Sequence, residues 1–120
     1  MIWDRRIRNR VVVVDAYPHD YDDLADQISR ADTEIVFVQS GQEALTACLT
    51  HMPAMWIVNM DLPDMSGIDL QTMLRGRGCR SPIALVGDRY SVTQEIDART
   101  AGADIYLAKP VHPQVVAAVA

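Results

Sequence analysis

Polar or small residues close four separate apolar runs of this 120-residue chain. Asp15 follows the run "VVVV", Asn59 ends "MWIVN", Lys109 follows "DIYLA", and Gly87 with Asp88 follows "IALV". Residues of these types at strand ends are where α/β proteins place binding and catalysis. The central one of the set is an amide, which is neither a nucleophile nor a base, so Asn59 cannot carry out covalent carboxylate chemistry.

The apolar runs are predicted to be the strands that position these residues. "VVVVD" (11–15) is a continuous β-branched run, the pattern of a strand buried on both faces of a parallel sheet. Further strands are predicted at 34–39, 55–59, 83–86 and 104–108. They alternate with amphipathic segments, which predicts an α/β fold with right-handed crossovers and helices on both sheet faces. The strand-end residues are then expected to share one crevice.

The helix boundaries are predicted from capping residues. Asp20 is expected to cap the first helix, and "SGQE" (40–43) has the capping-box form at the start of the second. A third helix is predicted from about Ser66 to Leu74, with Met73 among its inward residues. Pro113 suits the first turn of the last helix, which ends after barely two turns. We therefore expect this last helix to be cut short.

Composition predicts one compact domain. The chain is 49% apolar and 22% charged and carries a formal net charge of −5, which argues against a nucleic-acid-binding surface. Residues 1–10, which include four arginines, are predicted to form a solvated arm before a domain at 11–120. No long apolar span or signal peptide is seen, so no membrane association and a cytoplasmic location are expected.

The chain contains two cysteines, Cys48 in a helical pattern and Cys79 in the turn-rich stretch "GRGCRSP". Two cysteines so placed form neither a disulfide framework nor a metal motif. Both are predicted to be free thiols in a reducing compartment.

Several stretches together make the chain similar to the receiver domain of two-component response regulators, over about residues 10–120. The matching stretches are "VVVVDAYP", "NMDLPDMSG", "SPIALVGD" and, most specifically, "AGADIYLAKP" with its Lys109–Pro110 pair. The resemblance implies a single five-stranded parallel sheet, doubly wound as (βα)5, with the flavodoxin-like strand order 2-1-3-4-5. It also implies a cis peptide bond before Pro110.

The resemblance implies phosphoryl chemistry, but three demanding positions depart from the family pattern. Asn59 occupies the phosphoacceptor position, where the family has an Asp nucleophile. Ala16 replaces the second acid of the pair that holds Mg²⁺, and Gly87 replaces the hydroxyl residue that contacts the phosphoryl group. The resemblance therefore predicts a receiver that no longer phosphorylates and has no catalytic residue.

Other family positions remain. Asp15 and Asp61 form a remnant acidic pocket, to which Asp61 would contribute its backbone carbonyl. Lys109 matches the residue that neutralises phosphate, and Tyr106, with Gly87, matches the switch pair. Mg²⁺ is expected to bind weakly at best, through Asp15, and no cofactor is predicted. Asp61, Asp64 and Asp88 are interpreted as turn formers or solvated carboxylates rather than substitute phosphoacceptors.

The predicted function is a non-phosphorylatable signalling domain that acts by contact with a protein partner or a second copy. The expected contact face comprises 91–101, 104–108 and 113–120, with Val92, Ile96, Tyr106 and Val116 as candidate residues. An output domain beyond Ala120 is also expected, while direct nucleic-acid and membrane binding are not. The alternative is a small-molecule sensor that uses the vacated crevice.

Overall fold

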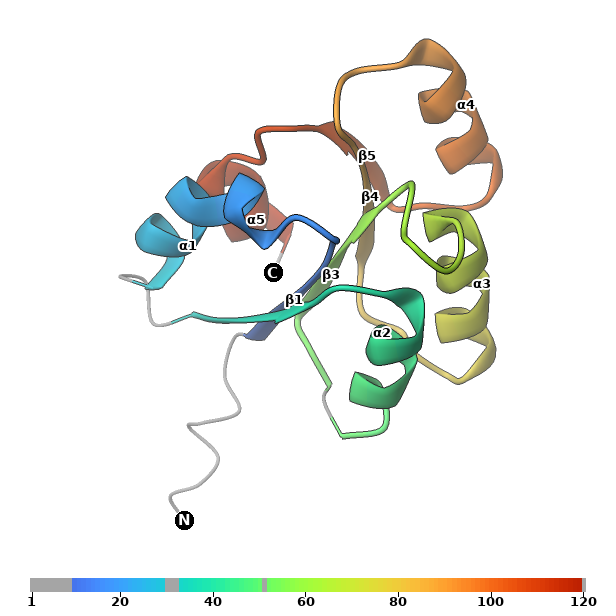
Figure 1. The fold of residues 1–120 in the computed structure, drawn as a ribbon, viewed down its shortest axis with the longest axis horizontal. Coiled ribbons are helices and arrows are strands. Elements are labelled where there is room, and N and C mark those ends of the chain that lie inside the picture. The colour runs from blue at the N-terminus through green and yellow to red at the C-terminus, as the bar shows by residue number, and fades with distance from the viewer. Residues whose placement is uncertain (1–9, 30–32, 51, 120) are drawn as a thin grey trace.

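A computed structural model describes residues 10–29, 33–50 and 52–119, which form a five-stranded parallel sheet (Figure 1). The strand order is β2-β1-β3-β4-β5, which confirms the predicted fold. The register places Val14 beside Val58, and Asn59 beside Val86, so the carboxyl ends of the strands are aligned. The strands are β1 (Arg10–Val14), β2 (Glu34–Val38), β3 (Met55–Asn59), β4 (Ile83–Gly87) and β5 (Ile105–Ala108).

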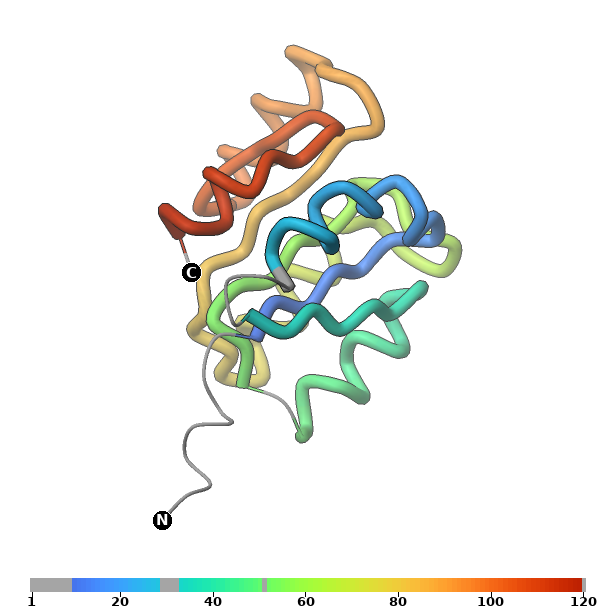
Figure 2. The backbone as a smooth tube through the Cα atoms, turned by 90° about the vertical axis from the view of Figure 1, so that its left-hand side faces the viewer, coloured from blue at the N-terminus to red at the C-terminus, as the bar shows by residue number. Residues whose placement is uncertain are grey.

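Helices cover both faces of the sheet. On one face, α1 (Asp22–Ser29) and α5 (Pro113–Val119) lie side by side (Figures 1 and 2). The other face is covered by α2 (Gly41–Ala47), α3 (Gly67–Gly76) and α4 (Val92–Thr100). Val11 and Val13 of β1 pack in the core on the α1 side, whereas Val12 and Val14 pack in the core on the α2 side. This double burial explains the unbroken valine run.

Side-chain caps fix where three of the helices begin. The Ser40 hydroxyl accepts a hydrogen bond of 3.1 Å from the backbone N–H of Glu43, as the capping sequence predicts. Ser66 and Ser91 cap α3 and α4 in the same way. These caps place the first turns of the helices beside the loops that follow the strands.

Two predicted helix features were wrong. A 3-10 helix, η2 (Pro18–Tyr21), precedes α1, so Asp20 lies inside a turn and its carboxylate is free for another partner. On α3 the buried side chains are Leu70, Gln71 and Leu74, which follow helical spacing, and Met73 is 43% exposed.

The predicted N-terminal arm overlaps the sheet by one residue. Arg10 begins β1, and its guanidinium forms a 2.7 Å ion pair with Glu34 on the neighbouring strand. Residues 1–9 lie outside the described residues, and so does Ala120. None of the helices in the described ranges has the length and apolar character needed to cross a membrane.

Candidate functional site

Lys109, just after β5, reaches across the carboxyl edge of the sheet to three carboxylates. Its Nζ lies 3.0 Å from Asp15 Oδ2, 2.7 Å from Asp20 Oδ2 and 2.8 Å from Asp88 Oδ1. An ammonium group has three N–H donors, so each donor has a carboxylate partner. The Lys109 side chain is only 9% exposed, and that of Asp15 only 1%. The cation and its central partner are therefore enclosed.

The Asn59 amide links two of these carboxylates to the loop after β3. Its Nδ2 donates to Asp15 Oδ2 at 2.9 Å and to Asp88 Oδ1 at 3.0 Å. Its Oδ1 accepts from the backbone N–H of Asp61 at 2.8 Å. The residue is buried, so these partners replace water. A carboxylate of the same shape could accept from Asp61 but could not donate to either Asp15 or Asp88.

Asp15 is surrounded by donors. Its Oδ1 accepts from the backbone N–H of Tyr17 at 2.9 Å, and its Oδ2 accepts from the Tyr21 hydroxyl at 2.8 Å. Asn59 and Lys109 also contact Oδ2, which therefore faces three donors. Burial, followed by the charge of Asp15 and its hydrogen bond, raises the pKa of Tyr21, which keeps the phenol protonated as a donor.

The charged groups of the crevice stabilise one another. Burial acts to lower the pKa of Lys109, but hydrogen bonds to Asp20, Asp88 and Asp15 outweigh it and raise this pKa above its ordinary value. The hydrogen bond from Lys109, followed by that from Asn59, lowers the pKa of Asp88. Both residues are therefore charged at neutral pH.

The loop after β3 is fixed to neighbouring elements. The Asp64 carboxylate accepts 2.9 Å hydrogen bonds from the backbone N–H groups of Gly41 and Gln42, at the start of α2. The bond from Gly41 is the main reason that the pKa of Asp64 is lowered. A Cβ on Gly67 would collide with the Asn59 carbonyl oxygen, so the loop packs closely on the strand end. Asp61 contributes its backbone N–H to the site, and the residue itself is exposed.

Tyr106 points inward above Gly87. Its hydroxyl donates to Gln94 Oε1 at 3.2 Å and accepts from the Ser91 N–H at 3.3 Å, and the residue is only 7% exposed. A Cβ added to Gly87 would lie 2.7 Å from the Tyr106 hydroxyl oxygen and 2.5 Å from Gln94 Oε1. Tyr106 and Gln94 therefore occupy the space that a larger side chain at position 87 would need.

The crevice does not fit Mg²⁺ as the family resemblance would have it. Magnesium needs several oxygen ligands in octahedral geometry, and Asp15 is the one acid retained from the expected pair. Its Oδ2 is already contacted by Tyr21, Asn59 and Lys109, so a cation there would meet an ammonium group. Across residues 10–29, 33–50 and 52–119, no three His, Cys, Asp or Glu side chains gather as a metal site.

Of the four residues expected on the partner face, two are exposed and two are buried. Val92 and Ile96 of α4 are each 59% exposed, and Tyr90 beside them is 58% exposed. Tyr106 and Val116 were predicted wrongly as surface residues. Both are buried because Tyr106 lies beneath the start of α4 and Val116 packs α5 on the sheet.

The sequence reasoning missed three site residues. Asp20 was interpreted as a helix cap and Asp88 as a solvated carboxylate, and Tyr21 was given no role in the site. In the structure, Asp20 contacts Lys109, and Asp88 contacts both Lys109 and Asn59. The Tyr21 hydroxyl donates to Asp15. Their places in the segments that follow β1 and β4 were the available signal, because both segments start at the carboxyl edge of the sheet.

The fold is thus the one expected of a receiver domain, and the crevice at the carboxyl edge of its sheet is filled by Lys109, Asn59 and Asp15. The family model of the response regulator receiver domain matches residues 11–120, and the chain belongs to this family. The Lys109–Pro110 peptide bond is cis, as the resemblance implied.

Relatives and solved structures agree with this assignment. The chain is 33% identical over 100 residues to the transcriptional regulatory protein KdpE of Mycobacterium tuberculosis, covering 83% of this chain and 44% of that protein. It therefore spans less than half the length of this relative. The BeF3-activated receiver domain of Klebsiella pneumoniae RstA is 26% identical, with a TM-score of 0.80 and 92% and 93% of the two chains covered. Vibrio cholerae CheY4 shares the fold, with a TM-score of 0.81 at 20% identity, covering 93% of this chain and 98% of that one.

Proposed function

We propose that this domain is a receiver that does not accept a phosphoryl group and that signals through protein contacts in a fixed conformation. The observation that carries the proposal is the pair of hydrogen bonds from the Asn59 amide to Asp15 and Asp88. The amide is a structural donor in this network, and it has no carboxylate with which to form an acyl phosphate.

The surroundings of Asn59 support the same function. A phosphoryl group arriving here would have to displace Asp15, Asp20 or Asp88 from Lys109, the cation that would neutralise it. The ammonium is already fully partnered, so it offers no free donor to an incoming anion. Ala16 adds no second acid beside Asp15. The site is therefore suited to holding its own groups together.

We propose a fixed conformation because the Tyr106 side chain points inward and is hydrogen-bonded there. Gly87 has no hydroxyl to be drawn toward a phosphate, and Tyr106 and Gln94 fill the space above it. The adjacent exposed residues Tyr90, Val92 and Ile96 form an apolar surface, which we call the α4 surface, and we propose it as the contact region. The proposal also includes a protein partner, an output domain beyond residue 120 and a cytoplasmic location.

The relatives are consistent with such a role. KdpE and the probable transcriptional regulatory protein TcrX, both of Mycobacterium tuberculosis, are named as transcriptional regulators and are more than twice as long as the region matched. By analogy we propose that this domain controls an output domain or partner. The alternative of a small-molecule sensor has no specific support, because Lys109, Asn59 and Asp15 occupy the interior of the crevice.

The test is phosphorylation by a small phosphodonor. The protein is incubated with acetyl phosphate and Mg²⁺ and measured by intact-protein mass spectrometry, with an Asp-bearing receiver as positive control. We expect no acid-labile phosphate on this chain under conditions that label the control. A phosphate adduct mapped to residues 59–64 would show that another carboxylate has replaced the nucleophile and would refute the proposal.

A further inference from the structure

The two cysteines, which are 31 positions apart in the chain, meet in the fold. Cys48 Sγ lies 2.7 Å from Cys79 Sγ, and both cysteines are free. Cys48 caps the end of α2, and Cys79 lies in the segment between α3 and β4. A disulfide has an S–S length of about 2.05 Å, so the two sulfur atoms are less than about an ångström from bonding distance.

The backbone at both cysteines is held in place. The Cys48 N–H donates to the Ala44 carbonyl at 2.9 Å, and the Cys79 N–H donates to the Leu74 carbonyl at 3.0 Å. The Arg75 guanidinium donates to the carbonyl oxygens of Cys79 and Ser81 and pairs with Asp104. Two thiols that are kept together by ordered backbone lose little further freedom when they are joined.

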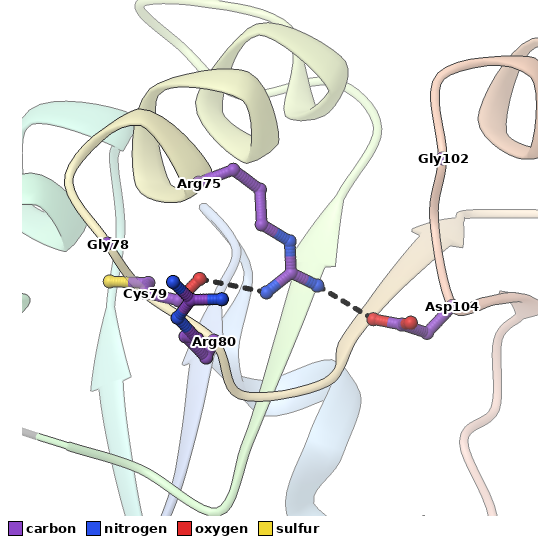
Figure 3. A pocket seen from close by; sticks show the side chains of 6 residues that line it. All are labelled: Arg75, Gly78, Cys79, Arg80, Gly102 and Asp104. Carbon is purple, nitrogen blue, oxygen red and sulfur yellow. Dashed lines mark hydrogen bonds and ion pairs between the residues drawn. The ribbon is translucent and has the colours of Figure 1, made fainter.

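Figure 3 shows the surroundings of Cys79 on the side of Arg75 and Asp104. Arg75 reaches across a hollow of about 460 Å³ toward the Cys79 carbonyl and Asp104, while the Cys79 sulfur points away from Arg75. The hollow is lined by Arg75, Gly78, Cys79, Arg80, Gly102 and Asp104. The thiol of Cys79 is therefore directed at its neighbour on α2, where it is buried, and Cys48 is the more accessible of the pair.

We propose that Cys48 and Cys79 are a reversible dithiol–disulfide site that exchanges with small disulfides such as oxidised glutathione. The Cys48 thiolate attacks one sulfur of the glutathione disulfide and releases one glutathione thiolate. The Cys79 thiolate then attacks the Cys48 sulfur of the mixed disulfide and releases the second. The two protein thiols lose two protons and two electrons, and one glutathione disulfide becomes two glutathione thiols.

Burial fixes the order and the pH dependence of these steps. Burial, followed by the hydrogen bond with Cys48, raises the pKa of Cys79 to about 11. The thiolate is the attacking species, so ring closure by Cys79 limits the reaction. At pH values below this pKa, the rate of ring closure should rise about tenfold for each unit by which the pH is raised. Glutathione release from Cys48 should therefore be the slow step at neutral pH.

The bond would link the end of α2 to the segment that follows α3, on one face of the sheet. α2 begins beside the β3–α3 loop and runs to Cys48, so the cysteines lie at the helix ends remote from Asn59. Closing the segment from 48 to 79 restricts the unfolded chain, so the melting temperature should rise by on the order of 10 °C. This effect is independent of the proposed function, because it uses none of the crevice residues.

The experiment is equilibration of the native protein with reduced and oxidised glutathione, followed by alkylation, mass spectrometry and tryptic mapping. Once equilibrium is reached, we expect both thiols to be lost without a retained glutathione, and peptide 31–75 to be linked to peptide 78–80. The same protein in urea should need a glutathione buffer at least about tenfold more oxidising, because the native fold holds the thiols together. Cys79→Ser should keep one glutathione on Cys48.

Three outcomes would overturn the site. They are a persistent glutathione on Cys48 in the wild-type chain with Cys79 reduced, a disulfide between chains, or equal oxidation in buffer and in urea. Failure of Cys79→Ser to take up glutathione would refute the exchange route. The comparison of native with urea-unfolded wild-type protein needs no variant, so a misfolded variant leaves the test intact.

Discussion

The crevice around Asn59 and the region around Gly87 lie on neighbouring strands, yet different forces hold them. In the crevice, one cation and one amide are bound by carboxylates that are partly or fully enclosed. Above Gly87, a tyrosine and a glutamine fill a space left by a missing side chain. Both regions hold residues that the resemblance to the family does not lead one to expect, and we propose that charge maintains the first region and shape the second. Substitutions that change charge should therefore act mainly in the crevice, and substitutions that add volume should act mainly at Gly87.

The largest effect is expected for Lys109→Met. It removes the cation from a carboxylate whose side chain is 1% exposed, which should cost about 3 kcal/mol in the free energy of unfolding. Arg99→Met is the matched control, because the Arg99–Glu95 pair lies on the surface, where water and salt screen it, and its loss should have far less effect. Urea unfolding at pH 7 measures both. Equal losses in the two variants would show that the crevice gains nothing from Lys109.

Asn59→Asp should cost about 2 kcal/mol at pH 7, although the two side chains have nearly the same shape. It removes two donated hydrogen bonds and adds a like charge beside Asp15 and Asp88. Those charges should raise the pKa of the introduced carboxyl, so the deficit should be full above that pKa and shrink as the pH falls through it. Asp61→Asn is the control. A variant as stable as the wild type at pH 7 would contradict the donor role of Asn59.

Gly87→Thr should cost about 1 kcal/mol and displace Tyr106 from its inward position. The new Cβ would lie 2.7 Å from the Tyr106 hydroxyl oxygen, so the ring has to move. The ring chemical shifts of ¹³C-labelled tyrosine report this movement. Gly76→Thr is the control for the ring position, because a Cβ there meets no atom within 4 Å. Unchanged Tyr106 ring shifts in Gly87→Thr would mean that the space is not limiting.

The smallest effect is expected for Asp88→Asn. The lowered pKa of Asp88 means that its contribution is present above the ordinary aspartate pKa of about 3.9 and is lost as the pH falls through the lowered value. The side chain is 60% exposed, so water and salt should limit the effect to under about 1 kcal/mol. Melting temperatures at pH 7 and pH 2.5 should show a smaller gap between variant and wild type at pH 2.5 than at pH 7. An equal gap at both values would exclude the charge as its cause.

The sequence predicted the parts of the fold that depend on local pattern. The unbroken valines of β1 and the serines at the starts of α2 and α3 led to the correct elements, and the alternation of strands and helices led to a parallel sheet. Their positions at strand ends also correctly predicted that Asp15, Asn59 and Lys109 lie in one crevice. These features need only short-range periodicity and the common direction of the strands.

The rest depends on where distant segments meet. Asp20 could be identified as a Lys109 partner only once η2 placed it opposite a residue 89 positions later. Val116 and Tyr106 looked like surface residues because one-sided burial of a short helix and of an edge strand is not encoded locally. The proximity of Cys48 to Cys79 likewise requires α2 to pack beside α3. These contacts depend on how far each side chain reaches in the folded chain, which residue type alone does not give. The successful predictions did not need that information.

The central claim is that the crevice is held closed by its own side chains and does not merely lack a nucleophile. Its most direct test is phosphorylation of Asn59→Asp by acetyl phosphate with Mg²⁺, followed by amide chemical shifts around Gly87 and Tyr106. We expect the single variant to show little or no phosphate-dependent shift, and a triple variant with Ala16→Asp and Gly87→Thr to shift part-way toward a switching receiver. Phosphate that shifted both variants equally and strongly would show that Asn59 was the only missing part, and the claim would be wrong.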